Sequence, residues 1–148
     1  MPVRPAEPGD FEEICALLLD HAEHEGAVDL MRLHRRRTHD ALFGEDPVIR
    51  AHVASPPDVP GTVAGLALWY PTFSSWETRS GIWLEDLYVR PEHRRYGLGR
   101  ELLNTLRSLT DGRVEWDVAH GNQGAEGFYR RLGAEPVGGW TRFRWSSR

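Results

Sequence analysis

The stretch EDLYVRPEHRRYGLGRELL, residues 85–103, places a strand-like run, a basic turn with glycines and a helix in direct succession. The apolar and aromatic residues before Pro91 predict a central strand over residues 80–91. After the turn, leucines recur at helical spacing and predict a helix over residues 97–110. The turn between the two elements contains Arg94, Arg95, Gly97 and Gly99.

Such a junction is chemically suited to bind an anion. A helix N-terminus exposes N–H groups without intrahelical partners and carries a partial positive charge. Glycines allow successive N–H groups to converge on a phosphate or pyrophosphate without interference from a Cβ atom. The nucleotide P-loop is excluded because no Gly-Lys-Ser/Thr follows, and the three-glycine dinucleotide pattern is also absent. On spacing alone, a basic turn with glycines needed only for chain reversal is the alternative.

The flanking sequence predicts further helices and strands. Helical spacing of apolar residues predicts helices over residues 10–25, 31–44 and 122–134, with Asp10 as a candidate N-cap and Gly44 at the end of the second. Residues 3–5 fit a short edge strand; alternation predicts strands over residues 47–55, 62–71 and 112–120, and a final strand or hairpin over residues 135–147. This order predicts one mixed α/β domain over residues 1–148 without a linker.

Composition narrows the class of protein. With 148 residues, 40% hydrophobic and 27% charged, the chain has the composition of an ordinary globular domain. It contains no apolar run of membrane-spanning length and no secretory signal, so we expect a cytoplasmic protein without a membrane partner. The net charge of -4 argues against nucleic acid as a partner. Cys15 stands among apolar residues, which favours a buried structural thiol, and no metal-ligand spacing occurs, so we expect no metal.

Several motifs together carry a resemblance to a known family. RRYGLG resembles the Arg/Gln-x-x-Gly-x-Gly/Ala signature of the GCN5-related N-acetyltransferases (GNAT), whose loop holds the pyrophosphate of acetyl-coenzyme A (acetyl-CoA). The order of elements is similar to that fold over residues 3–145. RPAEPGDFEEI, FGEDP, WLEDLYVRPEHRRYGLG, NQGAEGFYRRLGA and GWTRFR occur in the order found in the diamine (spermidine/spermine-type) acetyltransferase branch.

The resemblance implies a fold and a cofactor site. The implied fold is α+β, with a mixed, mostly antiparallel central sheet flanked by helices and with splayed central strands that hold acetyl-CoA. Diamine-type relatives form homodimers, so a homodimer is also expected. The positions implied to contact the cofactor are Leu87, Tyr88, Val89, Arg94, Arg95, Tyr96, Gly97, Leu98, Gly99, Arg100, Asn122 and Tyr129.

Acetyl transfer to an amine requires proton transfers, because an alkylamine with a pKa near 10.4 has only about one molecule in a few thousand as free base at pH 7. The resemblance implies Glu85 as the base, acting through a water, Tyr129 as the acid for the leaving thiolate, and backbone N–H groups around Leu87 as oxyanion donors. Direct attack by the amine then needs no covalent intermediate. The alternatives are a cross-strand surface carboxylate for Glu85, packing beside Phe128 for Tyr129, and a plain helix N-cap for Asn122.

The geometry of the strand decides whether the carboxylates of Glu85 and Asp86 lie on the same face of the sheet. On a regular strand Glu85 shares a face with Leu87, and Asp86 points to the other face. A β-bulge is usual in this family at this strand, so the facing of Asp86 is left open.

For the acceptor, the resemblance implies that His24, Glu25, Glu85 and Asp86 contact substrate, although the family has an aromatic residue at position 24. Gly127 also departs from the family, which often has a polar residue there. Further candidates for an acidic, aromatic channel are Glu77, Trp69, Tyr70, Trp76 and Trp83, with solvated charge or core packing as the alternatives.

Three functions follow in order of preference. The first is acetylation of a primary amine of a small polyamine, diamine or lysine-like molecule. The second is acetylation of a protein or peptide amine. The third is a binding module that senses acyl-CoA without turnover, against which the presence of both Glu85 and Tyr129 argues.

Overall fold

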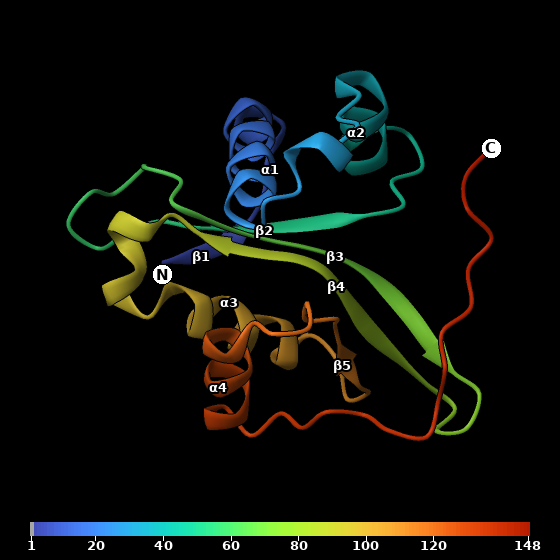
Figure 1. The fold of residues 1–148 in the computed structure, drawn as a ribbon. Helices are drawn as coiled ribbons and strands as arrows, with labels where there is room; N and C mark the ends of the chain where they lie inside the picture. The colour runs from blue at the N-terminus through green and yellow to red at the C-terminus, as the bar shows by residue number, and fades with distance from the viewer. Residues whose placement is uncertain (1) are drawn as a thin grey trace. The chain divides into compact units, whose positions relative to one another are not determined.

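The computed structural model describes residues 2–148 (Figure 1). The chain forms two compact units, with the boundary after Asp117. The first unit contains a five-stranded sheet, and the second contains one helix and the C-terminal segment. The expectation of a single domain over residues 1–148 stays a prediction.

The sheet of the first unit is mixed and mostly antiparallel, which confirms the predicted fold class. Its strands lie in the order β1 (Val3–Pro5), β2 (Arg50–Ala54), β3 (Gly65–Ser74), β4 (Arg79–Val89) and β5 (Val114–Glu115). Neighbouring strands from β1 to β4 are antiparallel, whereas β5 pairs in parallel with β4. The predicted strand-to-helix junction lies at the end of β4, the strand that also forms the parallel pair with β5.

Helices cover both faces of this sheet. In Figure 1, α1 (Phe11–His24) and α2 (Arg35–Phe43) lie over one face, and α3 (Leu98–Ser108) lies against the other. Three 3-10 turns complete the unit: η1 (Pro8–Asp10), η2 (Val28–Leu30) and η3 (Pro91–Tyr96). The predicted amphipathic face of α3 is confirmed, since its four leucines are buried: Leu98, Leu102, Leu103 and Leu106.

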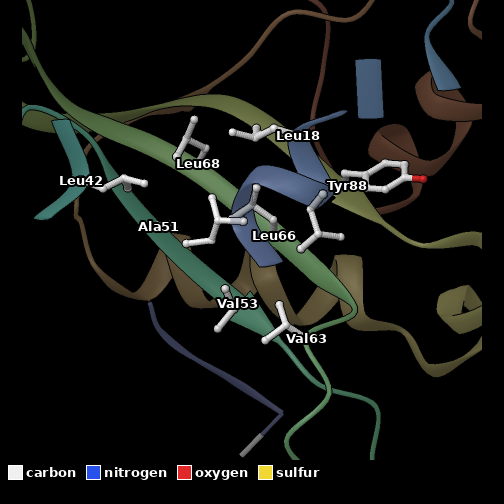
Figure 2. Close-up of a cluster of buried hydrophobic side chains, with 10 residues drawn as sticks. Leu18, Leu42, Ala51, Val53, Val63, Leu66, Leu68 and Tyr88 are labelled. Atoms are coloured by element: carbon white, nitrogen blue, oxygen red, sulfur yellow. The ribbon is translucent and has the colours of Figure 1, made fainter. Parts of the chain in front are cut away.

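The core between α1, α2 and the sheet follows strand periodicity. Figure 2 shows Ala51 and Val53 of β2 and Leu66 and Leu68 of β3, which recur every second residue and so point to one face. Leu18, Leu42, Val63 and Tyr88 pack around them. Each large apolar side chain buried here contributes roughly 1.5–3 kcal/mol through the hydrophobic effect. This core holds α1 against the end of β4.

Two local predictions near the N-terminus differ from the structure. Asp10 stands at the N-cap position of α1 but makes no capping hydrogen bond, because its carboxylate accepts from Arg4 and from the backbone N–H of Glu7 instead. The second helix begins at Arg35 rather than at residue 31, because His34 provides the cap by accepting from the N–H of Arg37. The prediction that Cys15 is buried is confirmed.

The predicted strand over residues 112–120 is reduced to Val114 and Glu115. Just before β5, the backbone at Gly112 passes very close to β4: a Cβ on Gly112 would lie 2.1 Å from the carbonyl oxygen of Ser80. The pairing ends at Trp83 of β4, and β4 bulges two residues later. A strand needs the N–H and C=O groups of a neighbour, so alternation alone overestimated its length.

The second unit contains α4 (Gln123–Arg131) and an extended C-terminal segment. Asn122 caps α4, because its Oδ1 accepts from the N–H of Ala125 at 3.2 Å. The predicted final strand or hairpin over residues 135–147 is wrong, because none of these residues is in a helix or strand. The Thr141–Trp145 alternation has the side-chain pattern of a strand, but the second unit offers no strand for it to pair with.

Candidate active site

The loop between β4 and α3 builds an exposed helix N-terminus. η3 ends at Tyr96, and the following Gly97 has a φ of +71° and serves as the N-cap residue of α3. The left-handed conformation is one that glycine adopts at little cost. The carbonyl of Gly97 accepts the first helical hydrogen bond, from the N–H of Glu101, whereas no side chain of the described residues caps the helix. The N–H groups of the first turn are therefore available to an anion.

The basic residues of this loop are anchored by their neighbours. Arg94 Nε donates to the carbonyl of Val89 at 2.8 Å, and its guanidinium lies 5.7 Å from the centre of the Tyr88 ring. Arg95 donates to the hydroxyl of Tyr96, which in turn donates to Asp58 at 2.7 Å. The loop thus presents two cations and an uncapped helix end within six consecutive residues, 94–99.

Strand β4 carries a β-bulge in the middle of the predicted site. Asp86 pairs with Leu68 of β3, but the next partner along, Trp69, pairs with Leu84, so Glu85 is the extra residue. This confirms the expected bulge, and the regular alternation between Glu85 and Leu87 does not hold. Leu87 pairs with Ala67, and Asp86 shares a face with Leu68, on the side of α1.

The bulge brings two consecutive carboxylates together. Glu85 Oε2 accepts from the indole Nε1 of Trp83 at 2.9 Å, and this tryptophan shares the α1 side of the sheet through its pairing with Tyr70. Burial, together with the charge of Glu85, raises the pKa of Asp86 to about 6. Asp86 is thus a carboxyl group that can exchange a proton near neutral pH.

A histidine of α1 faces this carboxyl group, and the sequence analysis missed it. His21 Nε2 lies 3.6 Å from Asp86 Oδ1, longer than a hydrogen bond, and its ring centre lies 5.2 Å from that of Tyr88. Burial lowers the pKa of His21, so the imidazole is mostly neutral at pH 7. The helical spacing of His21 to His24 and Glu25 was the available signal, since residues three and four apart share a helix face.

The other predicted substrate residues divide into two groups. His24 ends α1 with its ring 6.1 Å from that of Tyr88, and Glu25 follows it near enough to raise the pKa of His21. The structure thus brings both residues near the end of β4. Glu77 lies instead in the β3–β4 turn, where it pairs with Arg113 at 3.5 Å.

The candidate tryptophans lie in different surroundings. Trp69 is buried and its Nε1 donates to Nδ1 of His52 at 3.0 Å, which is a core role. Trp76 lies in the β3–β4 turn and is 85% exposed. Of the tryptophans considered, Trp83 is therefore the one held next to the carboxylates of the bulge.

Strands β4 and β5 separate beside the bulge. Their pairing covers Ile82 with Val114 and Trp83 with Glu115, and β5 ends there. Strand β4 continues for six further residues without a ladder partner on that side in the described sheet. The backbone around Leu87, predicted to supply oxyanion donors, lies in this segment.

The second unit holds the remaining predicted residues. Tyr129 lies on α4 with its ring centre 5.3 Å from that of Phe128, and Asn122 caps the same helix. Gly127 lies between them in sequence on α4. The capping role of Asn122 is confirmed, whereas the roles of Asn122 and Tyr129 toward a cofactor stay predictions.

Among residues 2–148, no group of three or more His, Cys, Asp or Glu side chains is arranged to hold a metal ion. None of the helices within these residues is long and apolar enough to cross a membrane.

Comparisons with known proteins agree with this geometry. A model of the acetyltransferase (GNAT) family matches residues 12–134. The chain is 32% identical to the thialysine N-epsilon-acetyltransferase of Bos taurus, over 96% of this chain and 90% of that protein. It is 29% identical to the spermidine/spermine N(1)-acetyltransferase-like protein 1 of Homo sapiens, over 97% of this chain and 22% of that protein.

The same fold occurs in solved structures of low sequence identity. An aminoglycoside acetyltransferase from an uncultured soil metagenomic sample superimposes with a TM-score of 0.74 and 22% identity, over 97% of each chain.

Proposed function

The chain belongs to the acetyltransferase (GNAT) family and is an acetyl-CoA-dependent N-acetyltransferase, and we propose that its acceptor is a primary amine of a small diamine, polyamine or lysine-like molecule. The observation that carries the acceptor class is the pair of carboxylates, Glu85 and Asp86, on one side of the β4 bulge. Two adjacent carboxylates attract a compact ammonium group. The relative from Bos taurus, whose name gives thialysine as its acceptor, is consistent with this class.

The residues of the β4–α3 loop fit the cofactor. The uncapped N-terminus of α3 and the two arginines would hold the pyrophosphate of acetyl-CoA, which supplies an activated acetyl group. The proposed contacts are those of the family signature: the β4 segment Leu87, Tyr88 and Val89, the loop residues Arg94, Arg95, Tyr96, Gly97, Leu98, Gly99 and Arg100, and Asn122 and Tyr129 of the second unit.

Proton transfer is assigned to two residues. Glu85 accepts the proton of the acceptor ammonium through a water, and its exposed position on the bulge leaves room for that water. Tyr129 gives its phenolic proton to the leaving thiolate, since a phenol is a donor with a pKa near 10. Backbone N–H groups around Leu87, beyond the end of β5, stabilise the oxyanion.

Acceptor binding is assigned to residues at the end of α1 and on the bulge. His24 and Glu25 join Glu85 and Asp86 in contacting the amine or its chain, and Trp83 offers an aromatic surface for a cation. We also propose a homodimer, by resemblance to the diamine-type acetyltransferases, which light scattering of the purified protein tests.

The test measures release of coenzyme A with acetyl-CoA and a panel of spermidine, putrescine, thialysine, lysine and a lysine-containing peptide. Wild type, Glu85→Gln and Tyr129→Phe are compared. We expect turnover on one or more free amines, reduced at least tenfold in each variant, because general acid–base catalysis contributes about 10²–10⁴-fold. Preference for the peptide would move the acceptor to protein amines. Binding of acetyl-CoA without turnover on any amine would refute the proposed acceptor class.

A further inference from the structure

His21 belongs to a different element from the two carboxylates: it lies on α1 and faces the bulge of β4. It lies on the last turns of α1, which the core of Leu17 and Leu18 holds against the sheet. Its Nε2 faces Asp86 at 3.6 Å, and its Nδ1 is buried without a partner among the described residues. Each of the two side chains is only about a quarter exposed, at 22% for His21 and 25% for Asp86.

Asp86 differs from its neighbour Glu85 in its surroundings. Glu85 is exposed and accepts a hydrogen bond from Trp83, so solvent and the indole stabilise its charge. For Asp86, the imidazole of His21 is the one side chain recorded within ion-pair distance in the described residues. Asp86 is therefore the less exposed of the two carboxylates, and one imidazole packs against it.

We propose that His21 is a positioning residue for the acceptor, which holds the Asp86 carboxylate on the bulge where its ionised form binds the acceptor ammonium. This inference rests on the proposed function and deepens it, because it adds to the acceptor site a residue of α1 that acts through Asp86. Glu85 keeps its proposed role as the base that acts through a water. The chemical class of acceptor is unchanged.

The imidazole of His21 acts on the carboxylate by packing. Its Nε2 lies 3.6 Å from Asp86 Oδ1, beyond hydrogen-bond distance, and the ring limits the positions that the carboxylate can take. Because a quarter of the Asp86 side chain is exposed, an ammonium group can reach the carboxylate from solvent.

The protonation of this pair depends on groups from three elements. Glu85 of β4 raises the pKa of Asp86, and burial raises it more, to about 6. At the end of α1, Glu25 raises the pKa of His21 while His24 lowers it, and Arg94 of η3 lowers it as well. Burial is the largest influence and leaves the imidazole with a lowered pKa. At pH 7 the pair is thus mainly a carboxylate beside a neutral imidazole, the state in which Asp86 attracts an ammonium group.

The first test is a carbon-13 NMR titration of the Asp86 carboxyl in the full-length protein, with Asp86→Asn used to assign its signal. We expect His21→Leu to raise the midpoint of this titration, because the carboxylate loses its imidazole and gains an apolar neighbour. His21→Gln, which keeps a polar side chain beside the carboxylate, should restore much of the wild-type midpoint. His39→Gln, on α2, is the matched control and should change nothing. Putrescine should lower the midpoint in wild type, because an ammonium stabilises the carboxylate.

The second readout is the pH profile of kcat/KM for the preferred amine. A rise of one pH unit in the Asp86 midpoint would lower the activity of His21→Leu at pH 6 by about fivefold, with little change at pH 8.5. A loss that is equal at every pH, with an unchanged titration, would overturn the proposal, because it would reduce His21 to a structural residue.

The outcomes separate this inference from the proposed function. Wild type that acetylates none of the amines refutes the proposed acceptor class. If putrescine and His21→Leu still shift the Asp86 titration in that case, the pair does position an amine. If neither shifts it, the inference fails as well.

Discussion

Replacing Asp86 with asparagine should stabilise the protein at neutral pH. Burial raises the pKa of this carboxyl from 3.8 to about 6, so the folded protein holds the Asp86 proton more tightly than the unfolded chain does. Its contribution to stability is therefore complete below pH 3.8 and is lost as the pH rises through about 6. The difference of about two pKa units corresponds to roughly 3 kcal/mol, which partial exposure reduces to about 2 kcal/mol.

The assay is urea unfolding of wild type and Asp86→Asn followed by circular dichroism at pH 4, 5, 6, 7 and 8. We expect the stability of the variant relative to wild type to grow by about 2 kcal/mol between pH 4 and pH 8, because asparagine does not ionise. Glu85→Gln is the matched control: it removes a carboxylate from the exposed neighbouring position and should change stability by well under 1 kcal/mol. Parallel curves for Asp86→Asn and wild type would refute the account of Asp86 as a carboxyl group destabilised by burial.

Other changes test the loop, the sheet and the N-terminal ion pair. Asp10→Asn should cost about 2 kcal/mol of unfolding free energy at pH 7, because Asp10 accepts two charge-assisted hydrogen bonds from Arg4. The cost should shrink as the pH falls, since Arg4 lowers the pKa of Asp10 and the carboxylate loses its charge at low pH. An equal cost at pH 3 and pH 7 would contradict this account of the ion pair. Gly112→Ala should destabilise the protein by more than 2 kcal/mol in thermal unfolding, because the new Cβ would lie 2.1 Å from a backbone oxygen of β4. Gly9→Ala, where a Cβ meets open space, is the control and should be nearly neutral. Similar melting temperatures for the two variants would refute this close contact. Gly97→Ala should weaken the binding of coenzyme A measured by calorimetry. The φ of +71° at this position, the N-terminus of α3, is unfavourable for alanine by about 1–2 kcal/mol, so the loop would change its conformation. An unchanged affinity would argue against this loop as the pyrophosphate site.

The fold was predictable where side-chain periodicity and hydrogen-bond partners agree. The leucines of α3 and the alternating core of β2 and β3 follow directly from spacing, because one face of each element is buried. The C-terminal segment over residues 135–147 shows the limit, since alternation describes side chains but does not supply a pairing strand. The same limit explains why β5 ends at Glu115.

The candidate site was predictable in its chemistry more than in its geometry. The loop with Gly97 was found from residue types, because a positive φ and an exposed helix end both favour glycine. Whether Glu85 and Asp86 share a side depended on one extra residue in β4, which spacing cannot reveal. His21 was missed because its role comes from α1 packing on β4, a contact between residues 65 positions apart in the chain.

The most direct test of acetyl transfer to a small amine is a competition measurement. Wild-type protein is incubated with acetyl-CoA and equal concentrations of putrescine, spermidine, thialysine and a lysine-containing peptide, and the products are identified by mass spectrometry. We predict acetylation of a primary amine on a free small molecule in preference to the peptide, with Glu85→Gln and Tyr129→Phe reducing that product. Acetylation of the peptide alone, or of none of the amines, would contradict this account.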